Sequence, residues 1–317
     1  GPLEGECPEI LQIAKCSVKG GSPRKLTSGR KWEWLLSGPS FSWLVVFFAI
    51  PTALIVLLSF KARSLEDGFA PGYDFEAWRR LWDGGILGML GHTLWLSLAT
   101  TLICVIWSLP VAWFLAKAAP RWRSVVLWLI MVPFWTNFLI RVFAWKSVAH
   151  PSGPLMAFLY WTKLMPEESL LLYNSGAVLL VLVYAHLPFA ILPLFAAVDR
   201  FDFGLLDAAR DLGAGPASAF FRIFLPGIRQ GMLSAAALVF IPALGAYLIP
   251  DLVGGSDGQM LGNLIARRVG ADRDWPQAAA MATLLVMASL LPLVAVWQWK
   301  RPRKSTAPDP ALAPDHA

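Results

Sequence analysis

Charged residues are scarce in this chain of 317 residues. They make up 15% of the sequence, against the roughly 25% typical of soluble domains, while hydrophobic residues make up 56%. The mean hydropathy of +0.56 agrees with this imbalance. The shortage of charge excludes an ordinary soluble domain, and spaced apolar runs favour one helical membrane unit.

Cysteine is scarce as well. Cys7, Cys16 and Cys104 form neither a CxxC pair nor a disulfide framework, so they say little about the redox compartment. The net charge of +6 could indicate nucleic acid, but the basic residues stand in short clusters between apolar runs. Orientation in a membrane explains that placement better, and we expect no nucleic-acid partner.

Catalytic motifs are missing. The sequence has no HExxH, no GxSxG and no GxGxxG opening a βαβ unit. It has no Gly-Lys-Ser/Thr, so it has no Walker A loop to bind ATP. We therefore predict a chain that is not an enzyme and carries no catalytic residue, metal ion or cofactor. His186 stands inside an apolar run, where a hydrogen-bonded packing residue is expected more often than a ligand.

Six apolar runs reach the roughly 20 residues that a helix needs to cross the hydrocarbon layer. They predict an all-α membrane protein whose transmembrane domain covers residues 40–299. The predicted spans are Ser40–Phe60, Thr93–Ala116, Ser124–Trp145, Gly176–Val198, Met232–Val253 and Ala278–Trp299.

The segments between the spans fall into two alternating sets. The set that includes both tails and the stretches 117–123 and 200–229 holds seventeen basic residues, and the other set holds nine. The positive-inside rule therefore places both termini in the cytoplasm. Residues 1–39 and 300–317 are expected to be cytoplasmic tails, largely disordered, and the Gly-Pro start suggests that part of the first is a cloning remnant. On the external side, Leu155–Met165 is either a short interfacial helix or a plain packed loop.

The long cytoplasmic segment at about 199–231 is patterned. Its first half, from Asp202 to Leu212, suits a short helix with Asp202 as an N-cap. Ala208 and Ala209 make a small, smooth patch that another protein could approach closely. Gly213 then suits the position after the helix, where a positive φ is needed.

The second half of this segment suits another helix, which Pro216 opens and Pro226 ends. Its phenylalanines are apolar enough to pack on the membrane bundle, whereas the first helix is polar enough to face a soluble partner. An ordinary amphipathic connector is the alternative interpretation.

The stretch "DAARDLGA", followed by "FFRIFLP", resembles the EAA loop of ABC-importer permeases. Acid, Ala-Ala, Gly and Ile-x-Leu-Pro stand at the family spacing, with Asp207 where Glu is usual. The resemblance implies the type I permease fold and a coupling helix that docks on a cytoplasmic ATPase. The residues that it implies for this contact are Asp207, Ala208, Ala209, Arg210 and Gly213.

Three further stretches, within Val132–Trp145, Leu187–Ala214 and Ile249–Ala280, resemble permeases of the spermidine/putrescine importer group. The resemblance covers roughly Ser40–Trp299. It implies a bacterial inner-membrane importer, surrounded by lipid, in which this chain pairs with a second permease. It also implies two copies of an ABC ATPase, which bind ATP and Mg²⁺, and an extracytoplasmic polyamine-binding protein.

A polyamine is an extended polycation, and its recognition needs carboxylates and aromatic faces. Asp251, beside Tyr247, is a candidate for the substrate path, because an acidic residue near the end of a span costs free energy and lining a cation path would explain it. The alternative is that Asp251 caps the following loop. Arg141 would repel a polyamine, so we expect it to pair with an acid or with helix carbonyls. Three further path candidates, each equally suited to packing, are Trp135, Asn137 and Tyr184.

Three other functions stay open. The same class of importer could carry another small substrate. A stand-alone secondary transporter should show inverted repeats or a proton relay of carboxylates, and we find neither in the sequence. A membrane scaffold or receptor would leave the helix–Gly–helix segment unexplained.

Overall fold

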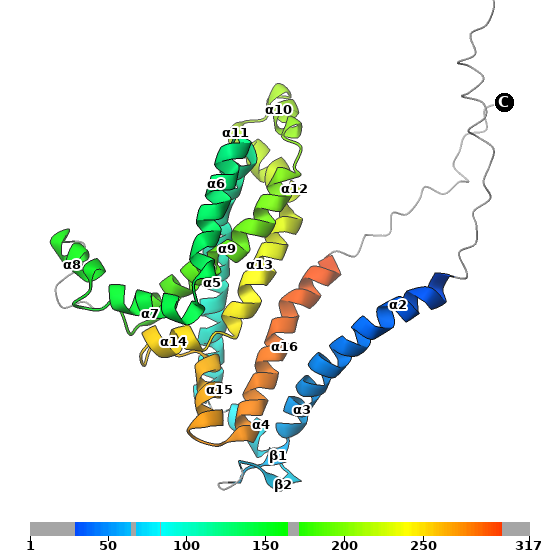
Figure 1. Ribbon diagram of the computed structural model, residues 1–317, viewed down its shortest axis with the longest axis vertical. Coiled ribbons are helices and arrows are strands. Elements are labelled where there is room, and N and C mark those ends of the chain that lie inside the picture. Colours follow the sequence, from blue (N-terminus) through cyan, green and yellow to red (C-terminus); the bar gives the residue numbers. More distant parts are fainter. Residues whose placement is uncertain (1–28, 65–67, 83, 164–170, 300–317) are drawn as a thin grey trace, which may run out of the picture. The chain divides into compact units, whose positions relative to one another are not determined.

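The computed structural model describes residues 29–64, 68–82, 84–163 and 171–299 (Figure 1). The chain divides into two compact units, Gly1–Leu54 and Ile55–Ala317. Residues 1–28 and 300–317, which make up most of the two predicted tails, lie outside the described residues, as do Cys7 and Cys16.

The first unit contains helix α2 (Gly29–Leu44), a π-helical turn (Val45–Ala49) and the beginning of α3 (Ile50–Leu58). Together they give a helical stretch, Ser37–Leu58, that is long and apolar enough to cross a membrane. This confirms a first span close to Ser40–Phe60, although the helix already begins at Gly29.

The second unit is helical apart from one small hairpin. Helices α5, α9 and α13 pack against one another and form its core (Figure 1). Its elements are β1 (Lys61–Ala62), β2 (Ala70–Tyr73), α4 (Glu76–Leu81), α5 (Gly84–Lys117), α6 (Pro120–Met131), α7 (Phe138–Val148), α8 (Pro154–Trp161), α9 (Ser175–Asp199), α10 (Gly204–Asp211), α11 (Pro216–Ala219), α12 (Leu225–Gly227), α13 (Arg229–Leu244), α14 (Leu248–Val253), α15 (Leu261–Gly270) and α16 (Trp275–Trp299).

Two predicted spans match continuous helices long and apolar enough to cross a membrane. The fourth agrees with α9 to within one residue at each end. The second lies inside α5, which begins nine residues earlier, at Gly84. The sixth prediction coincides with helix α16, of which Trp275–Leu290 is counted as a shorter apolar helix.

The prediction of a continuous third span, Ser124–Trp145, is wrong. Helix α6 ends at Met131, a 3₁₀ turn follows at Val132–Trp135, and α7 leaves at an angle of 92°. Pro133 cannot donate a helix hydrogen bond. Asn137 then caps α7, because its side-chain oxygen accepts from the backbone N–H of Leu139 at 2.8 Å.

The prediction of a continuous fifth span, Met232–Val253, is wrong as well. Helix α13 ends at Leu244, and the chain turns at residues 245–247 before α14 begins. The break packs closely on α15, since a Cβ added to Gly262 would lie 2.5 Å from the carbonyl oxygen of Ala246. Irregular backbone is tolerated at membrane depth where protein covers it or where it lines a cavity.

Six uninterrupted spans are therefore not what the structure contains. Within the described residues, three helices are long and apolar enough to cross a membrane, and the number rises to five if each of two bent helix pairs counts as one span. The second such pair, Pro216–Gly227 with Arg229–Leu244, bends by 65°.

The expectation of an all-α chain also misses the antiparallel hairpin of β1 and β2, in which Lys61 pairs with Tyr73 and Ala62 with Ala70. The Lys61 ammonium lies 4.5 Å from the centre of the Tyr73 ring and holds this register. In the external segment, α8 confirms a helix over Leu155–Trp161, and Met165 lies outside the described residues.

Most buried hydroxyl groups in α5 are satisfied within the helix, and the hydroxyl of Thr100 is an exception without a partner among the described residues. Ser97, Thr101 and Ser108 each donate to the carbonyl oxygen four residues earlier, which suits a helix without water around it. Thr93 accepts from the backbone N–H of Leu261 at 2.8 Å. This bond joins α5 to the first residue of α15.

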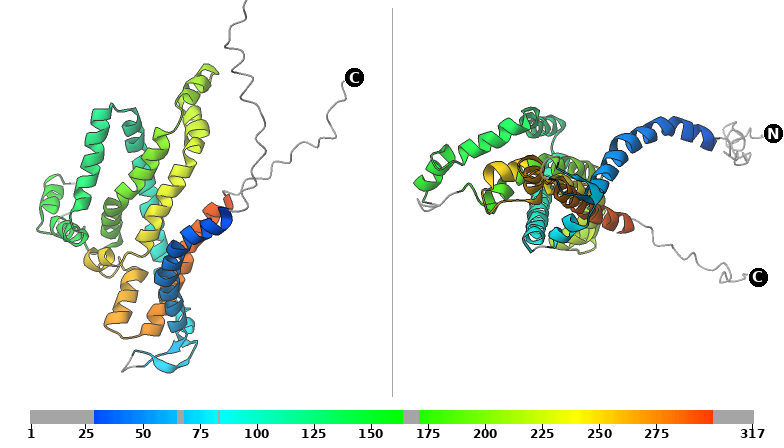
Figure 2. Two further views of the ribbon diagram at one scale, coloured as in Figure 1. Left: turned by 45° about the vertical axis from the view of Figure 1, so that its right-hand side comes forward. Right: turned by 90° about the horizontal axis from the view of Figure 1, so that it is seen from below.

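The segment predicted to couple and the predicted path residues of α14 lie toward opposite ends of the second unit. Helices α10 and α11 lie at one end of α5, α9 and α13, and α4, α15 and the hairpin lie at the other (Figures 1 and 2). The break between α13 and α14 brings Tyr247 and Asp251 toward α15.

Candidate functional site

Helix α10 ends in a tight reversal. The N–H of Gly213 donates to the carbonyl of Arg210, and the N–H of Ala214 donates to the carbonyl of Ala209, both at 2.9 Å. This pair of bonds is the Schellman motif, in which the residue after the helix takes a positive φ. Gly213 has a φ of +84°, as the sequence predicted.

The beginning of α10 differs in detail from the prediction. Helix α10 begins at Gly204, and the residue before it, Phe203, makes no side-chain cap. Asp202 instead accepts from the N–H of Gly204 at 2.9 Å. The carboxylate thus stabilises the turn that leads into the helix.

One face of α10 is buried against the rest of the unit. Leu206 and Ala209 belong to its main apolar cluster, which α5, α9 and α13 supply. Ala209 is therefore not available for approach by another protein, contrary to the expected Ala-Ala patch, whereas Ala208 is exposed.

The exposed face of α10 presents more than the predicted residues. Asp207 and Arg210 lie on it as an ion pair with a 3.6 Å separation, and Gly213 is exposed beside them. Leu205 and Leu212 lie on it as well, and Leu212 is 90% exposed. Sequence reasoning missed both leucines, although an apolar side chain in so polar a helix was a usable signal.

Aromatic rings attach this segment to the end of α5. The Trp113 ring packs edge-on against Phe203 of the loop and Phe224 of the second helical half, at centroid distances of 5.2 and 4.6 Å. The Lys117 ammonium covers Trp113 at 4.5 Å and Phe203 at 5.0 Å. Such contacts contribute beyond the area that they bury.

The second half of the segment begins with Pro216 as the first helical residue, as predicted. It continues as a π-helical turn, Phe220–Phe224, and ends at Gly227, one residue after the predicted stop at Pro226. The chain then bends into α13. The helix–glycine–helix arrangement expected from the sequence is thus present.

Two of the predicted path residues share a cavity of about 350 Å³. Tyr247 lies in the break after α13, and Asp251 lies one turn into α14. Across the cavity, α15 and the residues before it supply polar groups and one cation. These residues are Gln259, Asn263 and Arg267.

The carboxylate of Asp251 is exposed to this cavity. Among the residues that the structure describes, it has no hydrogen-bond or ion-pair partner. The alternative that Asp251 caps the following loop is therefore not what its side chain does. An acid without a partner in a polar cavity favours contact with a cation.

The other three path candidates lie elsewhere. Tyr184 lines a second cavity, of about 250 Å³, together with Arg141 and Trp145. Asn137 caps α7, and Trp135 is 75% exposed with its ring against Trp128. Neither Asn137 nor Trp135 is among the residues that line the two cavities.

Arg141 holds the sharp bend between α6 and α7. Its guanidinium donates to the carbonyl oxygen of Pro133 at 3.3 Å and lies 4.4 Å from the centre of the Phe134 ring. This confirms the expectation that Arg141 reaches helix carbonyls.

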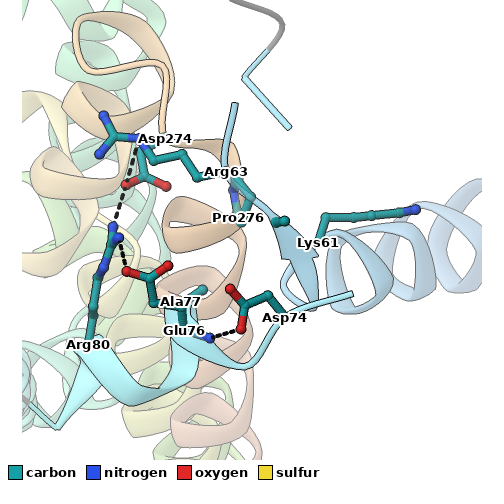
Figure 3. Close-up of a pocket in the computed structure, with 9 residues that line it drawn as sticks. Lys61, Arg63, Asp74, Glu76, Ala77, Arg80, Asp274 and Pro276 are labelled. Carbon is teal, nitrogen blue, oxygen red and sulfur yellow. Dashed lines mark hydrogen bonds and ion pairs between the residues drawn. The ribbon is translucent and has the colours of Figure 1, made fainter. Parts of the chain in front are cut away.

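Asp274 joins the start of α16 to the hairpin and α4 (Figure 3). Its side chain is 2% exposed, and its carboxylate lies 3.5 Å from Arg63 Nε and 3.3 Å from Arg80 Nη1. It also accepts from the N–H of Gln277 at 3.3 Å. Asp274 thus caps the first turn of α16, and a buried ion cluster accompanies this cap.

Comparison with known proteins identifies the family. Residues 108–304 match the family model described as "Binding-protein-dependent transport system inner membrane component". The chain belongs to this family. The match begins in the second half of α5. It includes the helix–glycine–helix segment at about 199–231, the cavity that Tyr247 and Asp251 line, and α16.

Two relatives are similar in sequence to this chain along most of its length. It is 36% identical over 259 residues to the spermidine/putrescine transport system permease protein PotB of Escherichia coli, which covers 82% of this chain and 94% of that protein. It is 35% identical over 252 residues to the protein of the same name from Haemophilus influenzae, with 79% and 88% covered.

A solved structure shows the same fold in this transport family. A chain of a bacterial ABC transporter involved in the import of the acidic polysaccharide alginate superposes with a TM-score of 0.63. The match covers 89% of this chain and all of that chain, at 18% identity. The chain therefore has the fold of an ABC-importer permease.

Proposed function

We propose that this chain forms half of the translocation path of a type I ABC importer for polyamines, and that a second permease forms the other half. The observation that carries the substrate class is the 36% identity to a spermidine/putrescine permease over 94% of that protein's length. The Asp251 cavity supports it, because a free carboxylate beside a tyrosine ring suits an ammonium group.

The exposed face of α10 is the proposed contact with the ATPases. Asp207, Ala208, Arg210 and Gly213 lie on it, and the Schellman reversal fixes its direction. ATP and Mg²⁺ bind in two copies of a partner ATPase, because this chain has no Walker A sequence. The buried residue of the motif, Ala209, acts by letting α10 pack closely.

The proposed orientation puts α10 and both termini in the cytoplasm. The excess of basic residues on that side supports it. The Asp251 cavity, α15 and the hairpin then lie toward the outer side, where an extracytoplasmic binding protein delivers substrate. The family description as a binding-protein-dependent system supports that partner.

Uptake by the reconstituted importer tests this proposal. Proteoliposomes that contain both permeases, the ATPase and the loaded binding protein should accumulate radiolabelled spermidine or putrescine only when the ATPase is supplied with ATP. A non-amine competitor should leave uptake unchanged. Uptake that ignores polyamines contradicts the substrate class and leaves the family membership untouched.

We expect Asp251→Asn to lower polyamine uptake about tenfold at substrate concentrations below saturation. A charge-assisted contact contributes about 1.5–3 kcal/mol, and 1.4 kcal/mol corresponds to a factor of ten. Initial uptake rates at several spermidine concentrations measure the effect.

Asp257→Asn is the matched control. Asp257 follows α14 in the same segment and is exposed, but it does not line the cavity. It should retain uptake close to that of the unaltered protein. Equal loss in both variants would place the effect in the segment rather than in the Asp251 carboxylate.

A further inference from the structure

Three arginines from distant parts of the chain line one further cavity, of about 440 Å³. Arg63 follows β1, Arg80 belongs to α4, and Arg268 belongs to α15. All three side chains are close to one-third exposed. Asp274 is the only acid among the described residues that line this cavity, so three cations face it with one anion.

Carboxylates behind the cavity hold these arginines in place. Asp274 lies between Arg63 and Arg80, as Figure 3 shows. Glu76 pairs with Arg80 from the same helix, and Asp272 lies 3.1 Å from Arg268 Nη1. Neither Glu76 nor Asp272 lines the cavity. These carboxylates thus fix the positions of the three guanidiniums before any ligand binds.

Arg268 has an unused donor. Its Nε atom is buried and has no hydrogen-bond partner among the described residues. A buried donor without a partner costs about 1–3 kcal/mol. The Arg268 side chain as a whole is 30% exposed, and phosphate oxygens match the planar donor fork of arginine.

The rest of the cavity is apolar. Ile86 and Met89 of α5, with Leu264 of α15, form its wall beside the basic residues. The cavity lies at the end of α5, where this membrane-length helix begins. Trp82, directly after α4, and Trp275, the first residue of α16, are exposed and lie close to Arg80 and Asp274 in the sequence. Exposed tryptophan is typical of the level of lipid headgroups.

We propose that this cavity binds the phosphate of an anionic phospholipid, with the arginines on the headgroup and the apolar wall along the first part of an acyl chain. A basic pocket between membrane helices suits such a ligand. The assignment of this lipid to the outer leaflet rests on the proposed function, because it follows from the proposed orientation of the chain. The lipid binding itself depends on neither a polyamine nor the ATPase.

Thermal unfolding of the detergent-purified full chain tests the proposal. Phosphatidylglycerol should raise the unfolding midpoint in a saturable way, and phosphatidylcholine should not. Arg268→Gln should weaken the apparent affinity for phosphatidylglycerol about tenfold, since it removes charge-assisted hydrogen bonds. Each variant is compared with its own lipid-free midpoint, so a general loss of stability does not count.

Arg267→Gln is the matched control, because Arg267 precedes Arg268 on α15 but lines the Asp251 cavity instead. It should bind phosphatidylglycerol within about twofold of the unaltered chain. Equal weakening in both variants, or equal stabilisation by phosphatidylcholine, overturns the site. Equal stabilisation by inorganic phosphate alone overturns the lipid as its source. Uptake measurements play no part, so failure here is distinct from failure of the importer proposal.

Discussion

Replacing Gly213 with valine should abolish most of the ATP hydrolysis that loaded binding protein stimulates, and most of the uptake with it. Gly213 has a φ of +84°, which a β-branched residue adopts only at considerable cost. The end of α10 would then unwind, and its exposed face would lose its direction toward the ATPase. We expect at least a tenfold loss of stimulated ATPase activity in the reconstituted importer.

Gly215→Val separates conformation from bulk. A Cβ at either glycine would meet nothing within 4 Å, but Gly215 has a φ of −66° and an extended backbone. Valine suits that conformation, including the position before Pro216. Gly215→Val should therefore keep most of the stimulated activity. Similar activity in the two variants would contradict a coupling role for the positive φ.

Asp274→Ala should lower the free energy of unfolding by about 3 kcal/mol. Removing one partner of a buried ion pair costs about 3–5 kcal/mol, and the lower end applies because Arg63 and Arg80 remain partly exposed. The first turn of α16 also loses the acceptor for Gln277. Thermal unfolding of the purified chain in detergent measures the loss.

Asp272→Asn should cost no more than about 1 kcal/mol, as for an exposed ion pair. It removes one i,i+4 partner of Arg268, and its side chain is 29% exposed. Asp272 and Asp274 are two positions apart in the sequence, so the comparison contrasts a partly exposed acid with a buried one at nearly the same place in the fold. Equal destabilisation would mean that the Arg63–Asp274–Arg80 cluster adds nothing to holding α16.

The helices most easily predicted from the sequence were those in which hydropathy is the dominant signal. The run that became α9 has no Asp, Glu, Lys or Arg between Ser175 and Val198, and its predicted bounds agree with the helix to one residue. The two broken spans are still mostly apolar despite Arg141 in one and Asp251 in the other, so a hydropathy window of membrane length ran across both breaks. Pro133 and Asn137 were the local signals of a stop and a new start.

The backbone conformation of the candidate site could be predicted from the sequence, but the buried and exposed sides of its helix could be predicted less well. Positive φ at Gly213 followed from residue type alone. Which side of α10 is buried depended on the rings of Trp113 and Phe224, which lie about 95 and 17 positions from the middle of the helix in sequence. Likewise, Asp251 and Arg267 share a cavity only because the chain breaks after Leu244. Local pattern carries no information on such contacts.

The ring packing around Trp113 connects α10 mechanically to the end of α5. On either side of α10, Phe203 and Phe224 pack edge-on against the Trp113 ring of α5, and such ring contacts have no hydrogen bond to break and little room to compress. In the proposed importer, a displacement of α10 would therefore push on the last turns of α5 through these rings. Because α5 is one unbroken helix from Gly84 to Lys117, that push acts as a lever on the far end, beside α15 and its two cavities.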